Sequence, residues 1–342
     1  MQRKHFISSL LASTVILPSF KIANNRSTAL NLKQVKLPSY LIAGDTIGIT
    51  CPAGFITADA IKPAVDLMQS WGFKIEIGST VNKRDFTLGG TDQERAADLQ
   101  YMLDNPNIKA IMCARGGYGV VRIIDKINFS KFSDSPKWVI GFSDITTLHN
   151  HIHTNCHLAT LHSKMCNSFP KDWSQAESIQ IETILSIKHA LMGEKMIYNA
   201  PASAYNRTGT ATGQLVGGNL SLIASMTGTP SDINTKGKIL FLEDTGEYIY
   251  NVDRMLYNLQ RSGKLEHLAG LIIGGFKLRP DEPDEEFGKR LETVVIEKVS
   301  KYKYPVCFDF PVGHQKNNYA FKCGVVHTLQ VTETGVQLES HM

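Results

Sequence analysis

Residues 138–146 have the sequence Trp-Val-Ile-Gly-Phe-Ser-Asp-Ile-Thr, an apolar run that stops at a small polar turn and then takes on helical spacing. This pattern predicts a buried strand, a sharp turn at Ser143 and a helix. A serine at such a corner holds its hydroxyl clear of its neighbours, and the first amides of the helix can face developing negative charge. Gly-x-Ser is also common where a serine or aspartate only begins a helix. Ser143 is therefore a candidate nucleophile whose partners must lie elsewhere in the chain.

On both sides of this turn, short apolar runs alternate with segments whose apolar residues recur at helical spacing. Such alternation predicts a parallel sheet with helices on both faces, a flavodoxin-like or Rossmann-like arrangement in which ligands bind at the carboxyl ends of the strands. The strands that we expect are residues 46–51, 73–77, 108–113 and 139–140, and the helices are residues 58–71, 92–103, 120–127 and 146–153.

The pattern changes after residue 163, and a β-rich second half is predicted. The predicted fold class is α/β, with an N-terminal parallel-sheet domain over residues 37–163, a connecting helix and linker over 164–204, and a β-rich, barrel-like C-terminal domain over 205–342. A continued doubly wound sheet is the alternative, because one of the later strands is followed by a helix. The elements expected here are a helix at 174–192, a linker at 193–207, strands at 210–216, 239–243, 271–275, 306–308 and 328–332, and helices at 220–226, 249–262 and 286–301.

The first 36 residues differ from the rest of the chain. Residues 1–5 are basic, residues 6–20 are mostly apolar or small, and the stretch up to Lys36 is polar without periodicity. This pattern predicts an export signal and a polar leader, and hence a periplasmic protein with no membrane span after processing. An uncleaved anchor is the alternative, and the protein would be cytoplasmic if the segment is not a functional signal.

The distribution of charged residues and cysteines argues against a nucleic-acid-binding protein and against a disulfide-rich protein. The 36 basic and 32 acidic residues are spread along the chain, and no basic tract is interleaved with aromatic residues. We therefore expect no nucleic-acid partner. The six cysteines have no zinc-ribbon spacing and predict no disulfide framework, although an exported protein could oxidise a pair that the sequence does not identify. They are Cys51, Cys113, Cys156, Cys166, Cys307 and Cys323.

A glycine-rich loop, Arg115-Gly116-Gly117-Tyr118-Gly119, follows the predicted strand at 108–113. Glycines let the backbone approach a ligand closely and direct its amides into a cleft. A phosphate loop needs Gly-x-Gly-x-x-Gly or a Gly-Lys-Ser ending, and neither is present. We expect an oxyanion or substrate-backbone role at the sheet edge shared with Ser143, with a purely structural turn and a nucleotide site as alternatives.

Candidates for a base and its orienting acid lie in the second half. The apolar run at 238–242 ends at Glu243, and a carboxylate at the mouth of a buried strand can orient a histidine, although such acids are often only strand ends or helix caps. His314 lies in a loop shaped by Pro311 and Gly313, and loops of this kind often carry function. A zinc site is the alternative, because His149, His153 and His157 are spaced four apart, but the glutamate of a His-Glu-x-x-His motif is missing.

Four ordered motifs carry a resemblance to a known family. Arg115–Gly119, Gly141–Thr146, Leu240–Asp244 and Pro311–His314 have the order and rough spacing seen in the LD-carboxypeptidases. This serine peptidase family includes murein tetrapeptide carboxypeptidases and microcin-immunity peptidases. The early segments 43–47 and 51–54 also resemble the family's domain start, so the likeness runs from about Leu37 to the C-terminus.

The resemblance implies a role for each motif. Ser143 would be the nucleophile, His314 the general base and then acid, and Glu243 the carboxylate that orients the imidazole, with Glu247 as the alternative acid. The serine would come from the N-terminal domain and the other two from the C-terminal domain. The resemblance further implies an oxyanion hole from the amides of Asp144 and of a glycine in the 116–117 turn, Gly117. Beside it we expect substrate contacts from Arg115, Gly116 and Tyr118, with a merely solvated Arg115 as the alternative.

The activity implied by the resemblance is hydrolysis of the bond between an L-configured centre and a C-terminal D-amino acid. The substrate class would be peptidoglycan-derived peptides, with D-alanine released from murein tetrapeptides through an acyl-enzyme, and the enzyme would be a homodimer. No metal or other cofactor is expected. Arg115 would pair with the terminal carboxylate of the substrate. The alternatives are a wall-peptide binding protein without turnover and an immunity peptidase that acts on a microcin-type peptide antibiotic.

Overall fold

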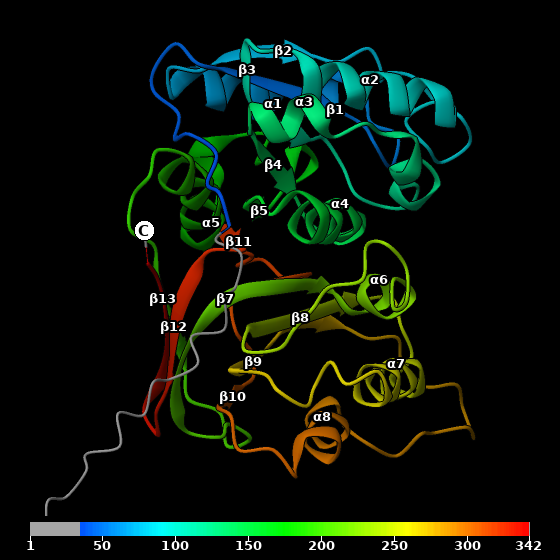
Figure 1. The fold of residues 1–342 in the computed structure, drawn as a ribbon, viewed down its shortest axis with the longest axis vertical. Coiled ribbons are helices and arrows are strands. Elements are labelled where there is room, and N and C mark those ends of the chain that lie inside the picture. The colour runs from blue at the N-terminus through cyan, green and yellow to red at the C-terminus, as the bar shows by residue number, and fades with distance from the viewer. Residues whose placement is uncertain (1–34, 342) are drawn as a thin grey trace, which may run out of the picture. The chain divides into compact units, whose positions relative to one another are not determined.

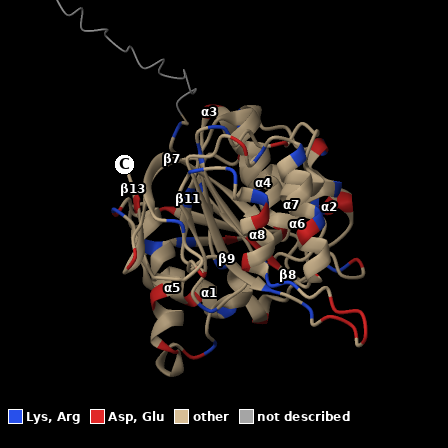
Figure 2. Cartoon of the chain, turned by 90° about the horizontal axis from the view of Figure 1, so that it is seen from below, with Lys and Arg blue, Asp and Glu red and all other residues tan. Residues whose placement is uncertain are grey.

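The structure is a computed structural model that describes residues 35–341. The export signal and most of the leader predicted for residues 1–36 lie outside the described residues and stay a prediction. Within the described part of the chain, no helix has the length and apolar character needed to cross a membrane. The positions of acidic and basic residues are interspersed along the ribbon drawn in Figure 2, in keeping with their even distribution along the sequence.

The first sheet has six strands in the order β11-β5-β4-β3-β1-β2. Its five N-terminal strands run parallel, and β11, which comes from the last part of the chain, pairs antiparallel with β5. The central strands β3 and β4 are buried on both faces, which explains their continuous apolar sequence. The strands are β1 (Thr46–Thr50), β2 (Lys74–Ile77), β3 (Ile108–Cys113), β4 (Trp138–Gly141), β5 (Thr160–His162) and β11 (Phe321–Cys323).

Helices cover both faces of this sheet, so the predicted N-terminal parallel-sheet architecture is confirmed (Figure 1). Side chains of α1 (Ala58–Ser70) and α5 (Ser178–Leu191) pack in one hydrophobic cluster. Side chains of α2 (Asp92–Asp104), α3 (Ser130–Asp134) and α4 (Thr146–His151) pack in another. Helix α2 begins with a capping box in which Thr91 and Glu94 exchange side-chain and backbone hydrogen bonds.

Two predicted helices of this half differ in detail. The segment 120–127, expected as one helix, forms two separate 3-10 turns, Val120–Arg122 and Ile124–Lys126. The Val120 amide donates to the side chain of Asp144, so a tertiary contact fixes the start of this segment. The helix expected at 146–153 ends as α4 at His151 and continues as a π-helical turn, Ile152–Cys156.

The second sheet has seven strands in the order β10-β9-β8-β7-β12-β13-β6. One half is parallel and carries helices, and the other half is antiparallel, so both arrangements considered from the sequence are present in one mixed sheet. The strands are β6 (Ile197–Pro201), β7 (Gly209–Asn219), β8 (Ile239–Thr245), β9 (Gly270–Lys277), β10 (Val306–Cys307), β12 (Val326–Val331) and β13 (Gly335–Ser340), and the helices are α6 (Leu220–Ser225), α7 (Ile249–Arg261) and α8 (Leu291–Val299).

The segment 193–207, expected as a linker, contains the edge strand β6. Tyr198 and Ala200 are buried, whereas Ile197, Asn199 and Pro201 are exposed, which is the two-residue alternation of a strand covered on one face. The strand follows Gly193 and ends in Pro201, so its surroundings have the composition of a turn. Pairing with β13, which follows far along the chain, makes it a strand.

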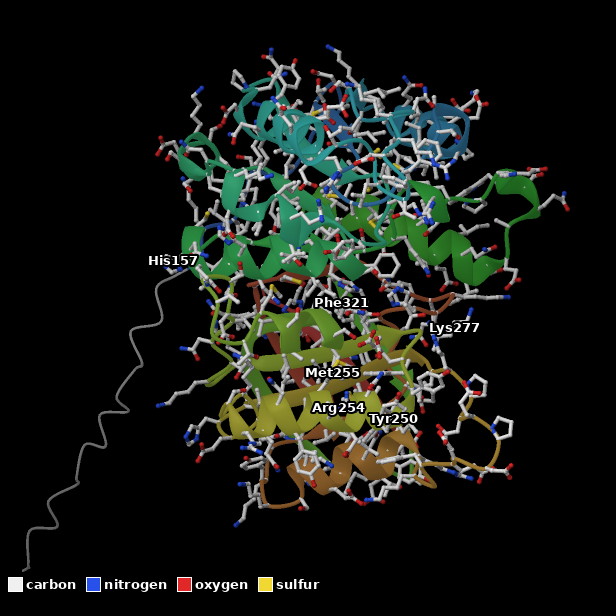
Figure 3. All side chains as sticks on the ribbon, turned by 90° about the vertical axis from the view of Figure 1, so that its right-hand side faces the viewer. His157, Tyr250, Arg254, Met255, Lys277 and Phe321 are labelled. Atoms are coloured by element: carbon white, nitrogen blue, oxygen red, sulfur yellow. The ribbon has the colours of Figure 1, made fainter. Side chains whose placement is uncertain are left out.

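The two sheets share one hydrophobic core. Phe321 of β11 lies between the two layers (Figure 3), and its ring centroid is 5.7 Å from that of Phe241 in β8. A second contact joins the two halves: the backbone amide of Asn219 at the end of β7 donates to the hydroxyl of Thr146 in α4 at 3.0 Å. These contacts place the carboxyl end of β4 next to the second sheet.

All six cysteines are free thiols, and five of them are buried. The structure pairs none of them.

Candidate active site

Ser143 lies at the junction between β4 and the turn that leads into α4. Its φ of 62° is in the left-handed region, which a residue with a side chain rarely adopts. Such a conformation costs about 1–3 kcal/mol and persists only where the surroundings enforce it. Here the next residue, Asp144, is buried and anchored to a second loop. The turn therefore holds the half-buried Ser143 side chain in one direction at the end of the strand.

Gly116 is the neighbour that Ser143 faces. A Cβ at Gly116 would lie 3.1 Å from the Ser143 Cβ and 3.3 Å from its Oγ, so a side chain at this position would crowd the hydroxyl. The Gly116 carbonyl accepts a hydrogen bond from the Gly54 amide at 3.0 Å. Because the peptide group is planar and trans, this bond turns the Gly117 N–H away from Gly54. Gly117 itself has a φ of 109°.

Hydrogen bonds made by the side chains of Asp144 and Arg95 connect the glycine loop, the serine turn and the loop after β1. The Asp144 carboxylate accepts from the Val120 amide at 2.8 Å, and burial raises the pKa of this carboxyl to about 6. The fully buried Arg95 donates to the carbonyl oxygens of Pro52 at 2.5 Å and Gly119 at 2.9 Å. Together they join the glycine loop to the serine turn and to the loop after β1. Arg95 was not among the predicted residues, because its sequence neighbours, which include Asp92, Glu94 and Asp98, give no local sign of an interior role.

His314 and Glu243 form a hydrogen-bonded pair. The distance from His314 Nδ1 to Glu243 Oε2 is 2.5 Å, and Glu243 in β8 is fully buried. Burial raises the pKa of the Glu243 carboxyl, and the bond to His314 opposes that effect. Gly313 permits the contact, since its φ is 101° and a Cβ there would lie 2.3 Å from the Glu243 Cβ. Glu247 instead accepts from the side chain of Asn251 at 2.9 Å.

The pair lies against the serine turn. The imidazole of His314 has its centroid 5.0 Å from the ring of Phe142, the residue directly before Ser143. Phe142 and His314 both line a cavity of about 670 Å³, together with Lys164 from the segment after β5. The structure thus brings the loop of His314 and strand β8 of the second sheet to the end of β4 in the first.

Arg115 and Tyr118 lie on the outer side of the glycine loop. The Arg115 guanidinium donates to the carbonyl oxygen of Phe55 at 3.1 Å and lines a neighbouring cavity of about 700 Å³ that His314 does not line. Tyr118 is 56% exposed. The structure does not bring these two side chains together with His314.

The histidines of the zinc alternative point in different directions. His149 Nε2 lies 2.9 Å from the Gly141 carbonyl oxygen, and burial lowers the pKa of this histidine to about 4. His153 Nε2 lies 2.7 Å from the ammonium of Lys238, and burial lowers its pKa to about 3. Across residues 35–341 there is no group of three or more His, Cys, Asp or Glu side chains placed to hold a metal. His149 and His153 therefore make separate buried contacts with different partners.

Two further polar residues support the His314 loop. The Asn318 side-chain oxygen accepts from the Gly313 amide at 2.7 Å and lies 3.2 Å from Nε2 of His162 in β5. Both side chains are fully buried, so this link crosses from the first sheet to the loop beside His314. No sequence pattern points to either residue, because the contact joins positions 156 residues apart.

Comparisons with known proteins identify the family of this chain. Residues 47–163 match the family model of the LD-carboxypeptidase N-terminal domain, and residues 212–329 match that of the C-terminal domain. The chain is 33% identical over 306 residues to a probable murein peptide carboxypeptidase of Bacillus subtilis, covering 89% of this chain and 94% of that protein. It is 28% identical over 290 residues to the murein tetrapeptide carboxypeptidase of Pseudomonas aeruginosa, covering 83% and 92%.

A solved structure extends the likeness to the fold. The crystal structure of muramoyltetrapeptide carboxypeptidase from Oxalobacter formigenes superposes with a TM-score of 0.77 at 25% identity, covering 87% of this chain and 99% of that one. The predicted family and fold class are thereby confirmed. The chain belongs to the LD-carboxypeptidase family of serine peptidases and is a carboxypeptidase.

Proposed function

We propose that this protein is a serine LD-carboxypeptidase that releases D-alanine from murein tetrapeptides with Ser143, His314 and Glu243 as its catalytic triad. The observation that carries the proposal is the 2.5 Å bond between Glu243 and His314, held against the residue that precedes Ser143. The names of the relatives from Bacillus subtilis and Pseudomonas aeruginosa support the murein peptide as substrate.

Each group has a defined part in the proposed reaction. With Nδ1–H donated to Glu243, the His314 Nε2 is free to take the proton of the Ser143 hydroxyl as Oγ attacks the scissile carbonyl. The amides of Gly117 and Asp144 stabilise the oxyanion of the tetrahedral intermediate, an effect worth about 3 kcal/mol for each donor. His314 then protonates the leaving amine of D-alanine, which leaves the rest of the peptide as an ester on Ser143.

Deacylation repeats these steps with water. His314 takes a proton from a water molecule that attacks the ester, and then returns a proton to Ser143 Oγ as the shortened peptide leaves. Glu243 holds the imidazole in the required tautomer and stabilises the imidazolium that forms in both halves of the reaction. Both halves of the proposed reaction need only the triad, the two backbone amides and water.

Ser143→Ala tests the proposal most simply. The purified variant and the wild type are incubated with a murein tetrapeptide, and released D-alanine is measured by mass spectrometry. We expect the variant to lose at least about 10³-fold in rate, because the nucleophile is gone. Ser130→Ala, an exposed serine on α3, is the matched control and should keep full activity.

The outcomes separate the alternatives. Full activity in Ser143→Ala would overturn the triad. Binding of the tetrapeptide by the wild type without product would favour a wall-peptide binding protein, and cleavage of a microcin-type peptide in place of the tetrapeptide would favour an immunity peptidase. Export to the periplasm and a homodimer, both expected from the sequence, stay predictions.

A further inference from the structure

The charged side chains that line the cavity beside His314 are all cationic. Three lysines, Lys164, Lys277 and Lys316, line it, and no aspartate or glutamate does. Lys277 ends β9 and is labelled in Figure 3. A cavity of about 670 Å³ with only cationic charges on its wall favours an anionic occupant.

The three lysines are not equivalent. Lys316 is 66% exposed, and its ammonium already bonds both carboxylate oxygens of Glu177, at 2.7 and 2.8 Å. Lys164 is only partly exposed, and its Nζ donates to the Gln315 carbonyl oxygen at 2.6 Å. It also lies 5.6 Å from the centroid of the Phe142 ring. Among the residues that the structure describes, Lys164 forms no ion pair within 4.0 Å.

Lys164 contacts a sequence neighbour of Ser143 and a sequence neighbour of His314. Phe142 directly precedes Ser143, and Gln315 directly follows His314, so the Lys164 contacts flank both groups. Burial lowers the pKa of Lys164, and the negative charge of the buried Glu243 partly compensates. An ammonium that has lost water and is bonded only to a carbonyl oxygen gains more from an incoming carboxylate than an exposed lysine does.

We propose that Lys164 binds the terminal carboxylate of the D-amino acid that is released, and so makes the enzyme specific for free C-termini. The inference rests on the proposed function, because His314 must reach the leaving nitrogen. In an α-amino acid, the carboxylate is separated from that nitrogen by the Cα alone. The carboxylate of the leaving residue therefore lies close to His314, on the wall of the cavity that Lys164 lines.

The other cations fit this role less well. Arg115, the carboxylate partner expected from the sequence, lines the neighbouring cavity and is bonded to the Phe55 carbonyl. Lys316 is neutralised by Glu177 in exposed surroundings. Lys277 lines the same cavity and adds positive potential there. Lys164 alone of these is in contact with residues adjacent to both Ser143 and His314.

The test compares two substrates and two lysine variants. The substrates are a murein tetrapeptide with a free C-terminal carboxylate and the same peptide with a C-terminal amide. The variants are Lys164→Met, which removes the charge but keeps the length of the chain, and Lys131→Met, a control on α3 whose lysine side chain is 75% exposed. Thermal melting of each variant checks that the fold is retained.

We expect the wild type to cleave the acid peptide with a kcat/KM about 10- to 100-fold above that for the amide, the usual worth of a hydrogen bond to a charged group. In Lys164→Met, kcat/KM for the acid peptide should fall by that factor, whereas kcat/KM for the amide peptide should change less than about 3-fold. The ratio of the two kcat/KM values should therefore approach one. Lys131→Met should keep the preference of the wild type.

Two results would overturn the inference. An equal loss on both peptides would mean that Lys164 only positions the His314 loop through the Gln315 carbonyl, and an unchanged preference would mean that another group binds the carboxylate. Binding of the two peptides to the Ser143→Ala variant, measured by calorimetry, keeps this question apart from catalysis. A preference for the acid peptide that Lys164→Met abolishes in that background supports the site even where no peptide is cleaved.

Discussion

Replacing Glu243 with glutamine should lower the catalytic rate without lowering the stability of the fold. The carboxylate is fully buried and accepts from His314 Nδ1 at 2.5 Å, so it both fixes the imidazole tautomer and balances the imidazolium charge. Loss of these effects in an otherwise intact triad costs about 10³- to 10⁴-fold in kcat, which corresponds to about 4 to 5.5 kcal/mol of transition-state stabilisation. We expect a loss of that size for Glu243→Gln on the tetrapeptide.

The stability of the Glu243→Gln variant should not fall with its activity. Burial raises the pKa of Glu243, so in the folded protein its ionised form is penalised, and this cost to folding grows as the pH rises through the folded pKa. Its Oε1 also has no hydrogen-bond partner among the described residues. An uncharged amide avoids the desolvation cost, and we expect the melting temperature of Glu243→Gln at pH 7 to equal or exceed that of the wild type.

The assay measures kcat/KM for D-alanine release together with the melting temperature. Glu247→Gln is the matched control, because Glu247 is four residues further on and bonds Asn251 instead of His314. A loss below about 10-fold in Glu243→Gln, or an equal loss in Glu247→Gln, would refute the assignment of the orienting acid. A clear fall in melting temperature would refute the view that Glu243 is kept for catalysis at a cost in stability.

Three further predictions address the scaffold and the chemistry. Gly313→Ala should lower kcat/KM at least about 100-fold, since the new Cβ would lie 2.3 Å from the Glu243 Cβ, whereas Gly246→Ala, also at positive φ but with open space around it, should lose only stability. The folded pKa of Asp144, about 6, exceeds its ordinary value of 3.8, so between pH 4 and pH 7 the wild type should lose up to about 3 kcal/mol more unfolding free energy than Asp144→Asn. Denaturant unfolding at both pH values checks this, and an equal loss of unfolding free energy in the two proteins would contradict it. A chelator should leave D-alanine release unchanged, because the triad uses no metal; loss of activity that zinc restores would contradict the proposed mechanism.

Local patterns were sufficient to predict the frame of the molecule. The strand that ends before Ser143 is apolar throughout because β4 is buried on both faces, and the helix spacings around it follow from burial of one side. The single helix expected at 120–127 and the linker expected at 193–207 were wrong, because the first segment forms two 3-10 turns and the second contains strand β6. In both, contacts with distant residues determine the structure: Asp144 for the first, and β13 for the second.

In the site, too, local patterns predict some residues, whereas contacts with distant residues determine others. Ser143, Glu243 and His314 lie at strand ends or in a shaped loop, so turn chemistry and motif order point to them. The side chains of Arg95, His162 and Lys164 act through contacts with carbonyl or amide groups of loops far away in sequence. A buried arginine, a histidine in a short strand and a lysine after it carry no local pattern that predicts such contacts.

The most direct measurement is acid quenching of the enzyme during turnover of the tetrapeptide, followed by peptide mapping. We expect the peptide containing Ser143 to gain the mass of the substrate acyl group without D-alanine, and the Ser143→Ala variant to gain no such mass. An adduct on another residue, or D-alanine release by Ser143→Ala at the wild-type rate, would contradict the claim that Ser143 is the nucleophile.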